Sequence, residues 1–104
     1  MSITDIKMFG LNERDMKTIQ SILLLFPEFK QIKLFGSRAK GSNKPGSDID
    51  LAIMDEGINE SRIMKLKEAF DESSLPYHVD ILHYPSLTQE ALKEHINRVG
   101  VSIF

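Results

Sequence analysis

Two aspartates that stand two positions apart, Asp48 and Asp50, are the residues of this sequence best suited to chemistry. Around them Ile49, Leu51 and Ile53 recur at every second position, which is the pattern of a strand with one buried face. Both carboxylates therefore project from the other face, where their like charges repel. Repulsion alone would protonate one of them, whereas a divalent cation lets both stay ionised. The pair by itself is weak evidence, because neighbouring acids on an exposed strand are common.

A glycine and a serine, Gly36 and Ser37, directly follow another predicted strand, at 31–35, which is the first in the chain. Glycine in such a tight turn lets the backbone approach a ligand closely, and free N–H groups there can hold phosphate oxygens. The surrounding segment 30–44 contains no acidic residue and carries the basic residues Lys30, Lys33, Arg38, Lys40 and Lys44. Charge runs of this kind are usually solvated surface, but this one also suits a small polyphosphate. The phosphates would then lie next to the metal.

A third acid, Asp80, lies in the predicted strand 77–82. It stands between Val79 and Ile81 and so faces away from them. Asp80 is a candidate site residue, and the alternative is an ordinary exposed strand acid or a helix-capping group. His78 should share the face of Asp80. Bordering the site is one interpretation, but the sequence favours an ordinary polar residue of the strand face.

The histidines give no sign of a dedicated zinc site. The sequence contains three of them, and they lack the close spacing of zinc ligands. For His95 the sequence favours no function. With no cysteine, a metal must be held by carboxylate oxygens or imidazole, and oxygen ligands point to Mg²⁺.

The helices that must hold these strands are predicted from the spacing of apolar residues. Three segments repeat apolar residues at helical intervals between a cap and a stop: from the N-cap Asn12 to Pro27, from 59 to 72, and from a capping box at 86–89 to Gly100. With a brief helical turn after the first strand, the order is α-β-(α)-β-α-β-α. This order predicts an α/β fold with helices packed on a small sheet. The apolar tail 101–104 could form a sheet edge, fill the core or contact a partner.

Length and composition predict one globular domain spanning residues 1–104. Of the 104 residues, 41% are hydrophobic and 27% are charged, which is ordinary for a folded protein. A net charge of −2 argues against a broad nucleic-acid-binding surface. The longest apolar run, 22–26, is far too short for a membrane span, so we expect a cytoplasmic protein. So short a chain has little material to enclose a pocket, and we expect a second chain to complete the site.

The segments 34–42 (LFGSRAKGS) and 47–51 (SDIDL) resemble the signature of the minimal nucleotidyltransferases, small members of the polymerase-beta-like superfamily. The resemblance extends over nearly the whole chain. It implies a small mixed sheet of three to four strands flanked by helices. It also implies Mg²⁺, with two ions in the site, and a nucleoside triphosphate, typically ATP, as substrate. The implied partner is a HEPN-domain toxin, held in a hetero-oligomer.

In this family the three acids have defined roles, and the resemblance carries them over residue by residue. Asp48 and Asp50 would ligate the metal ions, and Asp80 would complete the catalytic carboxylate set and accept the proton of the acceptor. No covalent enzyme intermediate is required, because catalysis is mainly positioning and charge stabilisation.

The same resemblance assigns the triphosphate to the glycine-serine turn. Gly36 and Ser37 would bind it through backbone amides and the serine hydroxyl, and Arg38 and Lys40 would neutralise its charge. For Arg38 a structural salt bridge to a neighbouring acid is the alternative, and for Lys40 it is exposed surface charge. Lys40 departs from the arginine that the family often has, which keeps the charge but loses the bidentate fork.

These assignments lead to one preferred function and two alternatives. The preferred function is transfer of AMP from ATP to a hydroxyl, such as that of a tyrosine, on the toxin, by an antitoxin enzyme. One alternative is an antitoxin that neutralises its partner by binding alone. The other is transfer to a small molecule, which we rank lower because the chain lacks the helical domain that would enclose such an acceptor.

Overall fold

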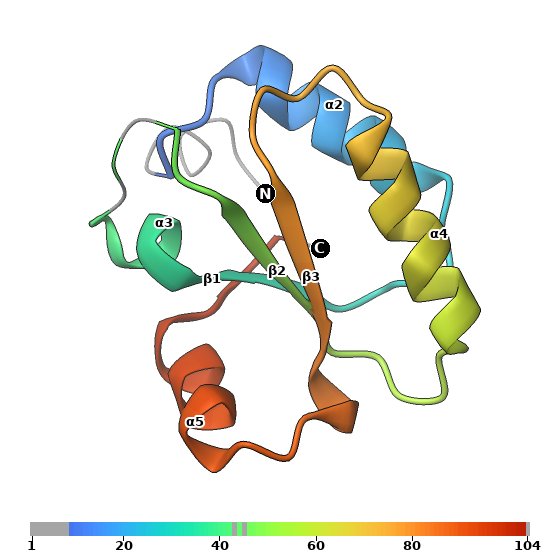
Figure 1. The fold of residues 1–104 in the computed structure, drawn as a ribbon, viewed down its shortest axis with the longest axis vertical. Helices are drawn as coiled ribbons and strands as arrows, with labels where there is room; N and C mark the ends of the chain where they lie inside the picture. The colour runs from blue at the N-terminus through green and yellow to red at the C-terminus, as the bar shows by residue number, and fades with distance from the viewer. Residues whose placement is uncertain (1–8, 43, 45, 104) are drawn as a thin grey trace.

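The computed structural model describes residues 9–42, 44 and 46–103. Its elements, shown in Figure 1, are in chain order α2 (Glu13–Leu24), β1 (Ile32–Phe35), α3 (Gly36–Lys40), β2 (Ile49–Ile53), α4 (Glu60–Asp71), β3 (Val79–His83), the 3₁₀ turn η1 (Tyr84–Ser86), α5 (Glu90–Val99) and β4 (Val101–Ser102). The predicted strands and helices are all present, with η1 and β4 in addition.

The strands form one mixed sheet in the order β3-β2-β1-β4. β1 runs antiparallel to both of its neighbours, whereas β2 and β3 are parallel. A parallel pair needs a long crossover, and α4 provides it between β2 and β3. The predicted α/β class, with a small mixed sheet flanked by helices, is confirmed.

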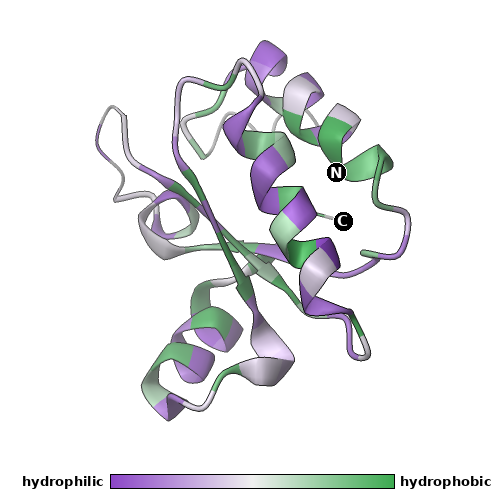
Figure 2. Ribbon diagram, turned by 45° about the vertical axis from the view of Figure 1, so that its right-hand side comes forward, coloured by the Kyte–Doolittle hydropathy of each residue, from purple (hydrophilic) through white to green (hydrophobic). Residues whose placement is uncertain are grey.

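The two faces of the sheet are covered differently. α2 and α4 lie side by side over one face, and α5 lies apart from them (Figure 1). The larger core cluster fills the space under α2 and α4 with residues such as Leu23, Leu66 and Leu51. On the opposite face a smaller cluster joins Phe35 and Ala52 to α5. Figure 2 shows the strands as mostly hydrophobic and the outer side of α4 as hydrophilic.

The start of α2 follows the prediction closely. The side chain of Asn12 accepts a hydrogen bond of 2.8 Å from the backbone N–H of Asp15, whose carboxylate accepts one of 3.2 Å from the N–H of Asn12. This reciprocal pair is a capping box, which satisfies N–H groups that the first turn leaves unpaired. Three residues after its last position, Pro27 prevents the helix from continuing.

The start of α5 differs from the prediction. The capping box predicted at 86–89 is wrong, because the helix begins at Glu90 after Gln89, which makes no side-chain cap. Ser86 instead ends the turn η1, and its hydroxyl lies 2.8 Å from Nδ1 of His83. Leu87 then adopts an extended backbone and packs against the smaller core cluster, so the chain bends before the helix starts.

The C-terminal tail combines two of the three predicted uses. Val101 and Ser102 form the edge strand β4 beside β1. Ile103 is buried in the larger core cluster, and its N–H donates a 2.9 Å hydrogen bond to the carbonyl of Ile32. Phe104 lies outside the described residues. Among the helices of the described segments, none has the length and apolar character that crossing a bilayer requires.

Candidate functional site

Asp50 on β2 and Asp80 on β3 are partners in the register of two parallel strands. Strand partners have their Cα atoms about 4.8 Å apart, so the two carboxylates start from neighbouring positions. Their strand neighbours Leu51 and Ile81 are buried in the larger core cluster, which turns both acids to the opposite face. Asp50 is partly buried and Asp80 is exposed. The fold therefore brings together two of the three predicted acids.

The third acid, Asp48, is exposed and immediately precedes β2. The pairing of β2 with the segment before β3 begins one residue later, where the N–H of Ile49 donates to the carbonyl of His78 at 2.9 Å. Asp48 thus lies at the open end of the strand pair.

The three acids form one electrostatic group. Burial raises the pKa of Asp50 above its usual value, and the negative charges of Asp80 and Asp48 raise it further. His78 and His95 oppose this rise in the pKa. A site that disfavours its own carboxylate charge in this way favours the binding of a cation.

Gly36 lies directly against Asp50. Its φ of +78° is in the left-handed region, which glycine adopts without strain. A Cβ at this position would overlap Oδ2 of Asp50 and would lie 3.0 Å from its Cγ. Phe35, the residue before it, is the cross-strand partner of Asp50. The turn from β1 into α3 therefore packs on the acid through bare backbone, and the partly buried Ser37 follows in the first turn of α3.

Arg38 does not lie where the sequence analysis expected it. Only 2% of its surface is exposed. Its Nε and Nη2 donate to the carbonyl of Ser47 at 3.2 and 2.7 Å, and its Nη1 donates to the carbonyl of Phe9 at 2.8 Å. Its Cζ lies 4.5 Å from the ring centroid of Tyr77. Neither the predicted phosphate contact nor the alternative salt bridge describes this arrangement, in which backbone carbonyls and an aromatic face hold the cation. Lys40, in contrast, is exposed at the end of α3.

His95 is a residue of this site that the sequence analysis missed. It comes from α5, and its ring meets the ring of Phe35 edge-on at 6.2 Å between centroids. It is also near enough to Asp50 to lower the pKa of that acid. No spacing in the sequence indicates this, because only the packing of α5 on the sheet brings residue 95 beside residue 50. The sequence analysis predicted the helix that carries His95, but not the face of the sheet on which this helix packs.

The donor set fits a hard cation such as Mg²⁺. Within segments 9–42, 44 and 46–103, no three acidic, histidine or cysteine side chains converge closely enough to make a ready-formed metal site. Mg²⁺ does not require one, because it keeps several waters and is commonly held by one or two carboxylates together with substrate phosphates. Asp50 and Asp80 supply such a pair of oxygen donors.

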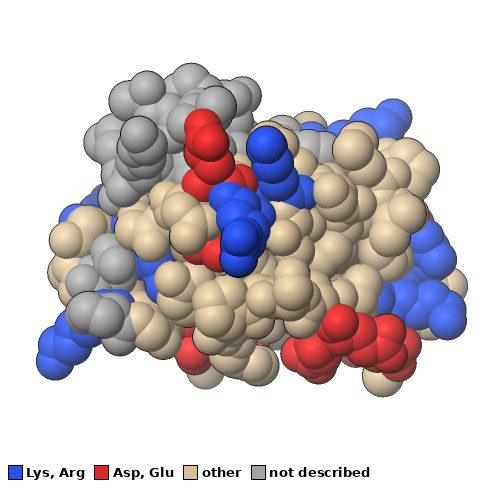
Figure 3. All heavy atoms as spheres, turned by 90° about the horizontal axis from the view of Figure 1, so that it is seen from above, with Lys and Arg blue, Asp and Glu red and all other residues tan. Residues whose placement is uncertain are grey.

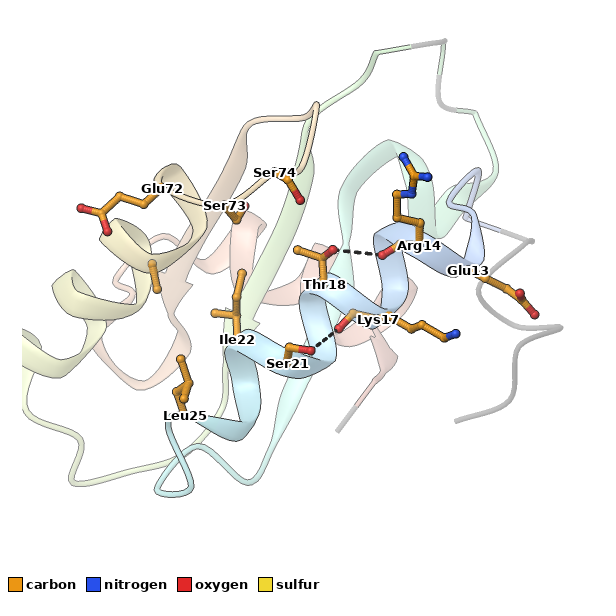
Figure 4. Close-up of a pocket in the computed structure, with 11 residues that line it drawn as sticks. Glu13, Arg14, Lys17, Thr18, Ser21, Ile22, Leu25, Glu72, Ser73 and Ser74 are labelled. Carbon is orange, nitrogen blue, oxygen red and sulfur yellow. Dashed lines mark hydrogen bonds between the residues drawn. The ribbon is translucent and has the colours of Figure 1, made fainter.

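A hollow of about 820 Å³ lies elsewhere in the described residues. It runs between α2 and the end of α4 (Figure 4). Two hydroxyls on its wall bond back to their own helix, Thr18 to the carbonyl of Arg14 and Ser21 to that of Lys17. No acidic pair like that of Asp50 and Asp80 lines it, so its size alone does not make it the site. We place the site at the acids instead, in an open surface position.

Residues 17–104 match the sequence family described as Polymerase beta, Nucleotidyltransferase, and the chain belongs to this family. Over 103 residues it is 37% identical to the probable protein adenylyltransferase MntA of Haemophilus influenzae, covering 97% of this chain and 89% of that protein. The resemblance to the minimal nucleotidyltransferases is thereby confirmed.

Two solved structures share the fold. One is a toxin-antitoxin structure with AMP-PNP, with a TM-score of 0.67 and 24% identity over 85% of this chain and 71% of that one. The other is a mutant of the toxin-antitoxin MntA-HpeT, with a TM-score of 0.64 and 21% identity over 86% of this chain and 71% of that one. At these identities they bear on the fold alone.

Proposed function

We propose that this chain transfers AMP from ATP to a hydroxyl group on a toxin protein that it binds, and so acts as an antitoxin. The observation that carries the proposal is the register pairing of Asp50 with Asp80 beside the bare backbone of Gly36. In that arrangement, carboxylates that could hold a metal lie next to a turn that could bind phosphates. The name of the Haemophilus relative, a probable protein adenylyltransferase, supports the same reaction.

In this proposal Asp48, Asp50 and Asp80 hold Mg²⁺, with two ions in the complete site. The metal supplies positive charge for the triphosphate and for the pyrophosphate that leaves it. Asp50 has the clearest case, because its raised pKa reflects burial and like charges that a cation would offset. Asp80 is exposed, which leaves it open to the acceptor hydroxyl.

The remaining roles follow from position. Gly36 and Ser37 bind the triphosphate, and the exposed Lys40 adds a positive charge near it. The acceptor oxygen forms a bond to the α-phosphorus while the bond from that phosphorus to pyrophosphate breaks. The hydroxyl proton passes to Asp80, and pyrophosphate leaves. We omit Arg38 from the phosphate contacts because its guanidinium is turned inward.

The openness of the site favours a protein acceptor over a small molecule. Asp48 and Asp80 are exposed, and neither of them lines the hollow between α2 and α4. Small ligands are usually bound in hollows that enclose most of their surface. An acceptor hydroxyl carried on another folded protein needs no such enclosure, and we propose a tyrosine of a HEPN-domain toxin. The face seen in Figure 3 carries acidic and basic groups side by side, without the broad basic area that a nucleic acid would need.

The test combines the purified chain with the HEPN-domain toxin proposed as its partner, ATP and Mg²⁺, and measures the intact mass of the toxin. We expect an added AMP group with the natural chain and with Asp71→Asn, a control that removes an exposed acid from the end of α4. With Asp50→Asn we expect transfer to fall by at least about a hundredfold, since even outer-shell changes at metal sites cost about 10- to 100-fold. An unmodified toxin after incubation with the natural, folded chain would contradict the proposal.

The alternative function is an antitoxin that acts by binding alone. Co-expression of the toxin with Asp50→Asn separates the two candidates. Full neutralisation of the toxin by this variant would favour binding alone, whereas loss of neutralisation with the complex still formed would favour AMP transfer.

A further inference from the structure

Arg38 is the largest fully buried side chain of the described residues, and it is a cation. The ion pairs described for this chain belong to Arg62 and Arg98, and neither includes Arg38. Burying a charge is costly unless other groups compensate it. Here the compensation comes from two backbone carbonyls and the face of one aromatic ring. A buried charge that is compensated in this way indicates a structural role for Arg38.

The groups that Arg38 contacts show what this structural role is. Its Nε and Nη2 converge on the carbonyl of Ser47, the residue immediately before Asp48. Its ring partner Tyr77 immediately precedes the segment that enters β3, three residues before Asp80. Arg38 itself stands in α3, two residues after Gly36. One guanidinium thus links the chain at the three places where it enters the candidate site.

The fork geometry of arginine is essential to this linkage. Nη1 donates to the carbonyl of Phe9 while Nε and Nη2 donate to that of Ser47, so different edges of one planar group bind different segments. A lysine ammonium carries the same charge on a single nitrogen and does not reproduce the plane or its stacking on a ring.

We propose that Arg38 is a positioning residue that sets the direction of Asp48 relative to Asp50 and Asp80 by holding the carbonyl of Ser47. The inference rests on the proposed function, because it takes these acids to bind Mg²⁺ and ATP. This positioning role and the phosphate-binding role expected from the sequence predict different kinetic effects of substituting Arg38. A positioning residue governs the Mg²⁺ requirement and the rate, whereas a phosphate ligand governs the KM for ATP.

The test compares Arg38→Lys with the natural chain and with the matched control Arg62→Lys. Arg62 also lies over an aromatic ring, with its Cζ 4.9 Å from the centroid of Phe26, and it bonds Glu28 at 2.6 Å, outside the candidate site. We measure kcat, the KM for ATP at saturating Mg²⁺, the Mg²⁺ concentration for half-maximal transfer, and calorimetric binding of ATP with and without Mg²⁺. Thermal unfolding of each variant reports the structural cost separately.

For Arg38→Lys we expect kcat to fall about 10- to 100-fold, the usual effect of disturbing the support of a metal site. The Mg²⁺ requirement rises, the Mg²⁺-dependent part of ATP binding weakens, and the KM for ATP at saturating Mg²⁺ is unchanged. Arg62→Lys leaves all of these values as they are. A raised KM for ATP with an unchanged Mg²⁺ requirement would overturn the inference, and so would a loss of thermal stability alone.

A second variant covers the case in which Arg38→Lys does not fold. Tyr77→Leu removes the ring beside the guanidinium and leaves both carbonyl partners in place. A higher Mg²⁺ requirement in this variant supports the inference, and an unchanged one overturns it. The natural chain in the same assays separates the two proposals. Its failure to transfer AMP contradicts the proposed function, whereas normal transfer with an unaltered Mg²⁺ response in the variants contradicts the positioning role alone.

Discussion

Gly36 and Asp50 are packed so closely that residue 36 has no room for a side chain. A Cβ on Gly36 would overlap the Oδ2 atom of Asp50, and the backbone there has a φ of +78°. Gly57 has a nearly equal φ of +71°, but a Cβ on it would meet nothing within 4 Å. Both positions therefore need a left-handed backbone conformation, but only Gly36 also needs space beside an acid.

We predict that Gly36→Ala abolishes AMP transfer while Gly57→Ala leaves it intact. Both variants bear the cost of a side chain in the left-handed region, about 1–2 kcal/mol of unfolding free energy. Only Gly36→Ala must also displace the carboxylate of Asp50. Urea unfolding gives the stability of each variant, and the mass of the toxin gives the transfer. Equal activities in two folded variants would contradict this account of Gly36.

The pH dependence of stability provides a second prediction, which concerns Asp50 without metal. Because its pKa is raised in the folded state, the folded chain binds more protons than the unfolded chain between the usual and the raised pKa. The free energy of unfolding contributed by this group therefore falls as pH rises through that window. Asp50→Asn removes this fall. As pH rises from the usual to the raised pKa, the free energy of unfolding of the variant therefore increases relative to that of the natural chain.

Urea unfolding in a metal chelator, from about pH 3 to pH 7, measures this difference. The control is Asp71→Asn, which lies on α4 and should follow the natural chain. Parallel curves for Asp50→Asn and the natural chain at every pH would show that Asp50 titrates as an ordinary exposed acid.

A third prediction concerns metal addition. In the proposed site the ionised carboxylates hold Mg²⁺, which in turn binds the phosphates of ATP. The two together should therefore raise the unfolding temperature, more strongly as pH rises. At a ligand concentration of about 100 times Kd the gain is about 2.7 kcal/mol. Asp50→Asn should show little of it. An equal rise in the unfolding temperature of the variant would remove Asp50 from the binding site.

A fourth prediction concerns His95, which packs edge-on against Phe35 and lowers the pKa of Asp50. His95→Gln removes a positive charge near the acid, so the pKa of Asp50 should rise further. The fall in stability described for Asp50 should then extend to higher pH. His83→Gln is the control, because His83 bonds Ser86 and the carbonyl of Asp55 at the other end of β3. A shift of the same size in both variants would contradict the link between His95 and Asp50.

Local patterns in the sequence were sufficient for most of the secondary structure. The cap at Asn12 and the apolar spacing after it depend on neighbours along the chain, and the structure confirms them. The capping box predicted at 86–89 failed for the opposite reason. There the hydroxyl of Ser86 lies 2.8 Å from Nδ1 of His83, a local contact that the motif does not include, and Leu87 packs against the smaller core cluster, a tertiary contact that no local motif contains.

The sequence by itself determined the candidate site residues Gly36, Ser37, Asp48 and Asp50, because they stand in two segments that resemble the signature of the nucleotidyltransferases. Only the tertiary structure decided how these groups meet. The crossover through α4 aligns Asp80 with Asp50, and the packing of α5 adds His95. The tertiary structure also buries the side chain of Arg38. The residue type gives the charge of a side chain, but contacts between segments distant in the chain set the direction in which it points.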